Sequence, residues 1–309
     1  MIAGSPLATV RHWWRFRHSL RRRWRTTPLS VRALIWMALG GLFFSLLNAL
    51  VRQLTLSVDP MQSQFLRYLF GVLVMVPWLW RHGLAAYRPV NLAGQFWRGL
   101  VHTLGLVLWF IALPRIPLAD MTAIGFTGPL FIMLGAAWFL GEPMRRDRWV
   151  AALVGFGGVM VVVAPNVSTD GGWYHLVMLA SSPVFAASFL ITKALTRYEQ
   201  PGVIVLWQAL TVTALSLPLA LPGWQMPTPW QWLGFACTGV LGTLGHYCVT
   251  RAFHAADISA TQSLRFLDLV WAAVLGWLLF ADVPSVSTFA GAVVILMASL
   301  WIARREGRR

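Results

Sequence analysis

Ten apolar runs dominate the sequence, and each is close to the ~20 residues that a helix needs to cross a bilayer. They cover residues 31–51, 61–80, 95–113, 120–141, 148–165, 173–195, 202–221, 231–252, 258–281 and 287–304. Turn-forming pairs such as Asp59-Pro60 and Gln200-Pro201 separate them. Since 58% of the residues are hydrophobic and only 11% are charged, the chain has too little polar surface for a water-soluble protein. We predict an all-α polytopic membrane protein with ten transmembrane helices.

The distribution of basic residues predicts the orientation of these helices. With the N-terminus in the cytoplasm, 21 of the 25 basic residues fall in cytoplasmic segments, Arg98 among them, and the outer joints hold only Arg52 and Arg115. Cytoplasmic loops are enriched in Arg and Lys, so we expect a multi-pass protein of the inner (plasma) membrane with both termini cytoplasmic. The net charge of +15 comes from these joints and the chain ends, which argues against a nucleic-acid partner.

The chain ends are basic and polar. Residues 1–30 alternate Trp with Arg and contain no apolar core followed by a cleavage site, so we expect no cleaved signal peptide. This segment either lies on an anionic membrane surface or is a disordered basic tail that fixes topology; both readings stay open. Residues 305–309 are expected to form a basic cytoplasmic tail. The thiols of Cys237 and Cys248, eleven residues apart on one expected helix, are too distant to form a disulfide within that helix.

The second half of the sequence repeats features of the first. Thr103-Leu104-Gly105 matches Thr243-Leu244-Gly245 at an offset of 140, and Pro60 matches Pro201 at an offset of 141. The chain therefore divides into two units of five spans, residues 31–165 and 173–304. Because five is odd, the second unit must enter the membrane from the opposite face. Inverted repeats of this kind are typical of secondary transporters, which bind substrate near the bilayer midplane between the repeats.

Several short motifs resemble those of a known family. They are Phe126-Thr127-Gly128-Pro129-Leu130-Phe131, Phe139-Leu140-Gly141-Glu142 and Gly155-Phe156-Gly157-Gly158-Val159 in the first half, and Gly239 to Gly245, Arg251-Ala252-Phe253 and Val270-Trp271-Ala272-Ala273 in the second. Both halves resemble EamA-type domains of the drug/metabolite transporter superfamily. The resemblance implies a ten-helix inner-membrane carrier that moves small organic metabolites by alternating access. Its implied substrates include amino acids, nucleoside-like compounds such as S-adenosylmethionine, and flavins.

The second half departs from this pattern at one position. Asp268-Leu269 stands where the repeat places Gly128-Pro129. Proline disrupts the regular hydrogen bonding of a helix, so Pro129 supports a helix break in the first half. We expect that break to be absent from the second half.

Three charged side chains, Arg67, Arg265 and Asp268, lie deep inside apolar runs, where an ionised group is costly and is a candidate for function. Arg67 binds an anionic or carboxylate group of the substrate, reaches the outer surface, or pairs structurally with a helix end; all three readings stay open. Arg265 and Asp268 are three residues apart, so we expect them to touch, either as a structural pair or as a pair that a substrate or proton separates. Two arginines against one aspartate leave the interior positive, which favours anionic or zwitterionic substrates.

Polar and aromatic residues inside the runs complete the candidate site. His246 and His102 titrate near neutrality when exposed, although a lone buried histidine is often only hydrogen-bonded to the backbone. Trp109 follows His102 by two helical turns and could stack on a planar substrate. The candidate substrate-binding residues are Asn48, Arg67, His102, Trp109, Thr127, Gln208, His246, Thr250, Arg265 and Asp268.

The sequence favours transport over other functions. An intramembrane enzyme would need catalytic pairs, but His-Glu-x-x-His, paired acidic residues and a Gly-x-Ser-x-Gly elbow are all missing. A sensor or scaffold has no evident use for an inverted repeat. The sequence has no nucleotide-binding loop, so we expect a proton or an exchanged substrate to drive transport. We expect no cofactor, no metal and no catalytic residues, a lipid bilayer and a small molecule as partners, and a monomer or homodimer.

Overall fold

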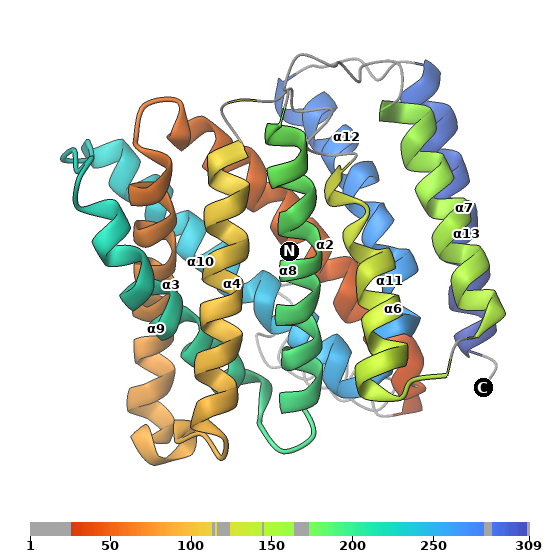
Figure 1. The fold of residues 1–309 in the computed structure, drawn as a ribbon, viewed down its shortest axis with the longest axis horizontal. Helices are drawn as coiled ribbons and strands as arrows, with labels where there is room; N and C mark the ends of the chain where they lie inside the picture. The colour runs from red at the N-terminus through yellow and green to blue at the C-terminus, as the bar shows by residue number, and fades with distance from the viewer. Residues whose placement is uncertain are drawn as a thin grey trace, which may run out of the picture.

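The structure is a computed structural model that describes residues 26–112, 115, 124–143, 145–163, 173–280 and 286–307. Its regular elements in these residues are helical (Figure 1). They are α2 (Leu29–Thr55), α3 (Pro60–His82), η1 (Leu84–Tyr87), α4 (Leu92–Ala112), α6 (Gly128–Leu140), α7 (Arg146–Val163), α8 (Tyr174–Leu195), α9 (Pro201–Ala220), α10 (Pro229–Ala255), α11 (Ile258–Gln262), η3 (Ser263–Phe266), α12 (Leu267–Phe280) and α13 (Val286–Gly307). Most of the basic segment 1–30 and the last two residues of the tail lie outside the described residues.

Helix starts coincide with the turn signals in the sequence. The Asp59 carboxylate accepts hydrogen bonds from the backbone N–H groups of Met61, at 2.8 Å, and Gln62, at 3.1 Å, while Pro60 occupies the first turn of α3. A capping box formed by Thr228 and Gln231 starts α10. Helices α3 and α10 therefore begin where a side chain can satisfy backbone N–H groups that have no partner within the helix.

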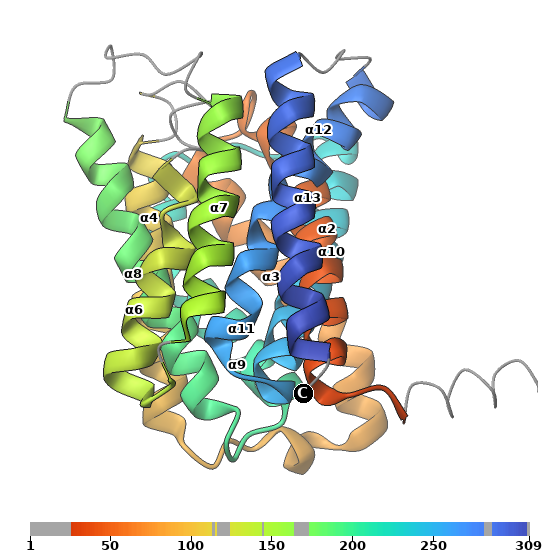
Figure 2. The ribbon, with the colours of Figure 1, turned by 90° about the vertical axis from the view of Figure 1, so that its right-hand side faces the viewer.

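The helices pack mainly across the two halves of the chain. The largest contacts join α2 to α10, α4 to α8, α3 to α9 and α7 to α13 (Figures 1 and 2). Helix α2 begins and α13 ends at the same end of the bundle (Figure 2). Among the described residues four helical segments are long and apolar enough to span a membrane: 29–55, 174–195, 201–220 and 258–275. The count of ten crossings therefore stays a prediction.

The expected absence of a helix break in the second half is wrong. In the first half a turn at Phe126 and Thr127 precedes α6, and in the second half the 3₁₀ segment η3 separates α11 from α12. The rings of Phe126 and Phe266, which the repeat makes equivalent, lie 5.8 Å apart. The second break therefore forms without a proline: its 3₁₀ turn packs against the first break, so tertiary contact holds the irregular backbone.

Candidate functional site

A cluster of polar side chains is buried where helices of both halves meet. Its members, called the polar cluster below, are Tyr68 on α3, Arg98 and His102 on α4, Ser188 and Thr192 on α8, Gln208 on α9 and His246 on α10. Each has a relative exposure of 5% or less. Buried polar groups are usually hydrogen-bonded, and in this cluster most of the hydrogen bonds join its own members.

The hydroxyl of Tyr68 links the two histidines of the cluster. Its oxygen lies 2.9 Å from Nε2 of His102 and 3.3 Å from Nε2 of His246. Nδ1 of His102 lies 3.2 Å from Oγ of Ser188, whose hydroxyl donates to the carbonyl oxygen of Arg98. One proton arrangement satisfies the whole chain with both rings neutral: His246 donates to Tyr68, Tyr68 to His102, His102 to Ser188 and Ser188 to Arg98.

Arg98 lies inside the bundle, so its assignment to the cytoplasmic joint is wrong. It is 1% exposed, and its guanidinium donates to Oγ1 of Thr192, to the carbonyl oxygen of Ile204 at 2.9 Å and to Oε1 of Gln208. These acceptors are neutral, and none of the described residues gives Arg98 a carboxylate partner. Helix α4 begins at Leu92, which places this arginine in its second turn and not in the joint before the helix.

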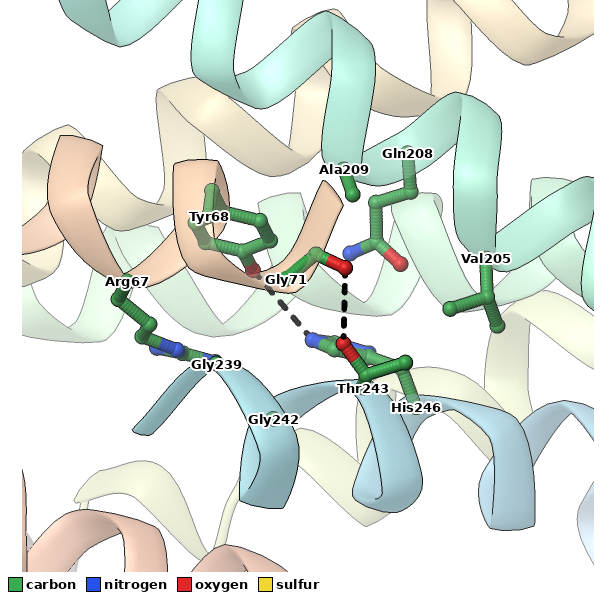
Figure 3. A pocket seen from close by; sticks show the side chains of 10 residues that line it. All are labelled: Arg67, Tyr68, Gly71, Val205, Gln208, Ala209, Gly239, Gly242, Thr243 and His246. Atoms are coloured by element: carbon green, nitrogen blue, oxygen red, sulfur yellow. Dashed lines mark hydrogen bonds between the residues drawn. The ribbon is translucent and has the colours of Figure 1, made fainter. Parts of the chain in front are cut away.

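A small pocket, with a cavity volume of about 10 Å³, adjoins the polar cluster (Figure 3). Helices α3, α9 and α10 form its walls, with Arg67, Tyr68, Gly71, Val205, Gln208, Ala209, Gly239, Gly242, Thr243 and His246. Three of the sequence-predicted site residues, Arg67, Gln208 and His246, therefore line one cavity. Arg67 and Gln208 are also equivalent in the repeat, so the two halves contribute polar groups from corresponding positions.

The expected contact between Arg265 and Asp268 is wrong: no ion pair joins them among the described residues. Arg265 lies in η3, with its guanidinium 5.0 Å from the centroid of the Phe189 ring and with a buried, unpaired Nη1. Asp268 lies in the first turn of α12 against Gly41 of α2. The 3₁₀ turn between them changes the helical spacing that would have placed these side chains together.

Four other sequence-predicted residues lie elsewhere. Asn48 is exposed and does not line the pocket. Trp109 packs edge-on against Phe110, with ring centroids 5.0 Å apart. The hydroxyls of Thr127 and Thr250 donate to backbone carbonyls of their own helical segments, so these groups are already satisfied.

Sequence reasoning missed four members of the polar cluster: Tyr68, Arg98, Ser188 and Thr192. Tyr68 directly follows Arg67, a predicted site residue. Arg98 precedes His102 by four residues, which places Arg98 and His102 on one face of α4. That spacing was an available signal. Ser188 offered none, because serine is common in apolar helices.

Removing the Tyr68 hydroxyl tests the polar cluster. The substitution Tyr68→Phe leaves Nε2 of both histidines without this partner, so we expect a loss of ~1–3 kcal/mol and a melting temperature lower by several degrees in detergent. The hydroxyl of Tyr247, on α10, donates no hydrogen bond to a described residue, so Tyr247→Phe serves as the matched control. Equal melting temperatures for the two variants would contradict the hydrogen-bond chain.

The described residues contain no group of three His, Cys, Asp or Glu side chains placed to hold a metal ion. Cys237 and Cys248 are free thiols, one exposed and one buried.

Comparisons with known proteins agree on one family. The model of a family described as "EamA-like transporter family" matches residues 31–164 and 172–304. A "Riboflavin transporter" of Rhizobium johnstonii is 37% identical over 284 residues, which cover 91% of this chain and 93% of that protein. An "S-adenosylmethionine uptake transporter" of Rickettsia felis is 28% identical over 271 residues, 88% of this chain and 92% of that protein.

Two further comparisons extend this result. A pseudopaline exporter of Pseudomonas aeruginosa is 29% identical over 272 residues, covering 87% of this chain and 94% of that protein. A solved crystal structure matches the fold with a TM-score of 0.76 at 20% sequence identity, over 88% of this chain and 98% of that chain.

Proposed function

This chain belongs to the EamA-like transporter family, and from that premise we propose that it is a secondary transporter for a small organic metabolite. It is a multi-pass membrane protein, and its family and the relatives named above are transporters, not enzymes. In the proposal it works in the inner (plasma) membrane by alternating access, with both termini in the cytoplasm.

One observation carries the proposal: a pocket with polar walls lies inside an apolar bundle, between helices of both halves. Arg67, Gln208 and His246 contribute hydrogen-bonding groups to it, while Gly71 and Gly239 allow α3 and α10 to approach closely along its wall. Transporter sites at the interface of two repeats have this character. We propose the remaining members of the polar cluster as support for this site, and Arg265 and Asp268 as a second polar region that the substrate meets.

The packing supports an inverted repeat. When each helix of residues 31–165 is exchanged for its equivalent in 173–304, the pair α2–α10 becomes α8–α4, and both pairs are in extensive contact. The pairs α3–α9 and α7–α13 exchange into themselves, as elements around a two-fold axis do. In this proposal the two units rock against each other along these contacts.

The substrate class follows from charge and from the relatives. Arg67, Arg98 and Arg265 outnumber Asp268 among the charged groups inside the described helices, so the interior favours ligands that carry negative charge or electron-rich oxygen. The named relatives transport riboflavin, S-adenosylmethionine and pseudopaline. We therefore propose riboflavin as the first candidate substrate, with S-adenosylmethionine and amino acids as the next, and a proton or an exchanged substrate as the driving force.

Two carboxylates clamp the halves together at one end of the bundle. Glu142, between α6 and α7, accepts from the backbone N–H groups of Ile258, at 2.8 Å, and Ser259, at 3.0 Å, where α11 begins. Glu199, between α8 and α9, accepts from the N–H groups of Val90, at 2.8 Å, and Asn91, at 3.0 Å, just before α4. Each half therefore holds a helix start of the other half.

Positive charges strengthen the clamp at α11. Arg148 donates to Oγ of Ser259 at 2.8 Å and pairs with Asp257 at 3.0 Å. The ammonium group of Lys193 donates to the carbonyl oxygens of Phe253 and Ala256, both at 2.7 Å. Alternating access requires this end to open and close, so we propose that these contacts form in the state in which it is closed.

Neutralising the clamp should open this end. In Glu142→Gln the amide replaces one acceptor oxygen with a donor, so at least one charge-assisted bond to the start of α11 is lost. We expect a cysteine introduced at the buried position Ala260 to react with a water-soluble maleimide about tenfold faster in this background, since such bonds contribute ~1.5–3 kcal/mol. Glu199→Gln, which makes the same change at the other clamp of this end, should also raise labelling at Ala260, whereas Asp59→Asn, at the start of α3 at the opposite end of the bundle, should leave it unchanged. Equal labelling rates in Glu142→Gln and the wild type would refute the proposal.

The substrate proposal is tested by a thermal-shift screen of purified protein against riboflavin, S-adenosylmethionine, amino acids and organic anions. A ligand that binds only the folded state raises its apparent stability by RT ln(1 + c/Kd), where c is the free ligand concentration. We expect riboflavin to raise the melting temperature, and to do so less in Arg67→Ala. If no compound changes it, the proposed substrate classes are wrong.

A further inference from the structure

We infer that Arg98 fixes Gln208 as a hydrogen-bond donor to the substrate, and that the pocket thereby selects a carbonyl or carboxylate oxygen. The inference rests on the proposed function and names the chemical group that the pocket recognises. Arg98 is a positioning residue in this account, because it acts on the substrate through Gln208.

The orientation of the Gln208 amide follows from the chemistry of its partner. A guanidinium can only donate hydrogen bonds, so the atom of Gln208 that meets Nη2 of Arg98 must be the oxygen Oε1. The amide nitrogen then has to point away from Arg98. Figure 3 shows that nitrogen turned toward Gly71 and Tyr68, on the opposite wall of the pocket.

This amide nitrogen has no partner in the described protein. Gln208 is 1% exposed, and its Nε2 makes no hydrogen bond to any described residue. A buried N–H₂ group without a partner costs ~1–3 kcal/mol, which a substrate acceptor would recover. Gln208 lines the pocket, so the unpaired donor faces the space that a substrate would occupy.

Arg67 supplies a second donor to the same pocket. Its guanidinium lies 4.9 Å from the centroid of the Tyr68 ring, and it donates no hydrogen bond to a described residue. The hydroxyl of Thr243, by contrast, is directed to the carbonyl oxygen of Gly71 at 3.4 Å. The two donors without partners therefore come from α3 and α9, and together they match the lone pairs of an oxygen acceptor.

Arg98 is itself held rigidly, which makes it suited to position another group. Its three hydrogen bonds reach α8 and α9 from α4, and its side chain is fully buried. Gly99, the next residue on α4, packs so closely on Thr211 of α9 that an added Cβ would lie 2.4 Å from the Cβ of Thr211. The helix that carries Arg98 and the helix that carries Gln208 are thus in close contact, which leaves the guanidinium little freedom to move.

The test uses Gln208→Glu in the full-length protein reconstituted in liposomes, with riboflavin as the probe. The new carboxylate pairs better with Arg98 but loses the donor, so a purely structural role predicts normal transport and unchanged or higher stability. Our inference predicts a KM for riboflavin about tenfold higher with a much smaller change in kcat. Gln53→Glu, at an exposed position on α2, controls for the added charge and should leave KM unchanged.

A second variant tests the positioning role of Arg98. In Arg98→Lys a single ammonium cannot hold Thr192, Ile204 and Gln208 together, so the amide becomes free to rotate and KM should rise several-fold. Gln208→Leu should then raise KM by a smaller factor in the Arg98→Lys background than in the wild type, because the two residues act as a unit. Fully additive effects would overturn the positioning role.

The outcomes separate this inference from the function on which it rests. Transport by the unmodified protein with an unchanged KM in Gln208→Glu overturns the inference and leaves the function standing. If riboflavin is not transported, S-adenosylmethionine, whose carboxylate offers the same acceptor, replaces it as the probe. If neither compound is transported, the proposed function and the inference both fail.

Discussion

Arg67→Ala is expected to reduce transport by raising the KM for the substrate about 10- to 100-fold. A hydrogen bond from a charged donor contributes ~1.5–3 kcal/mol, and each ~1.4 kcal/mol changes affinity tenfold. Because the Arg67 guanidinium donates no hydrogen bond to a described residue, its removal should not lower the melting temperature. Initial rates of riboflavin uptake into liposomes, measured over a range of concentrations, give KM and kcat separately.

Two further variants test the expected rise in KM. Arg67→Lys keeps the positive charge but loses the planar fork, so its KM should fall between those of the wild type and Arg67→Ala. Arg81→Ala removes an exposed arginine at the end of the same helix and should transport normally. A normal KM in Arg67→Ala, with normal protein levels, would show that this arginine does not contact substrate.

Gly239→Ala is expected to cause the largest loss of stability. A Cβ at this position would lie 2.6 Å from the carbonyl carbon of Phe70 and 2.9 Å from the backbone nitrogen of Gly71. Backbone atoms in the middle of a helix cannot move aside, so α3 and α10 must separate. Overpacking of this kind costs ~1–3 kcal/mol or more. Since both helices wall the pocket, we expect a lower melting temperature together with a loss of substrate binding.

Gly157→Ala is the matched control on α7. Nothing lies within 4 Å of a Cβ added there, and the residue is exposed. Alanine is favoured over glycine in a helix by ~1 kcal/mol, so this variant should be as stable as the wild type or more stable. If Gly239→Ala and Gly157→Ala melted at the same temperature, the close contact between α3 and α10 would be refuted.

The helices were largely predictable from the sequence, because a chain in lipid must satisfy its backbone within each span. Run length and turn residues alone located α3, α9 and α10 to within a few residues. The break before α12 was not predictable, because it depends on a contact with the equivalent break near Phe126 and not on a local proline. Irregular backbone held by tertiary packing leaves no signature in the segment itself.

The candidate site was predictable in its residue types but not in its connections. The cost of burying polar groups in a membrane drew attention to Arg67, Gln208 and His246, which the structure places around one pocket. The same argument was not applied to Arg98, because this residue was assigned to a cytoplasmic joint and therefore was not a candidate for the site. The predicted contact between Arg265 and Asp268 is wrong because it assumed one regular α-helix, and a 3₁₀ turn alters the spacing of these two side chains.

Uptake of labelled riboflavin into liposomes that contain the purified protein tests the central claim most directly. The account predicts saturable, time-dependent accumulation that protein-free liposomes lack, and a large loss of that uptake at low substrate concentration in Arg67→Ala but not in Arg81→Ala. S-adenosylmethionine and amino acids are measured in parallel. If no compound accumulates above the protein-free level, or if Arg67→Ala transports as well as the wild type, a transporter working through this pocket is contradicted.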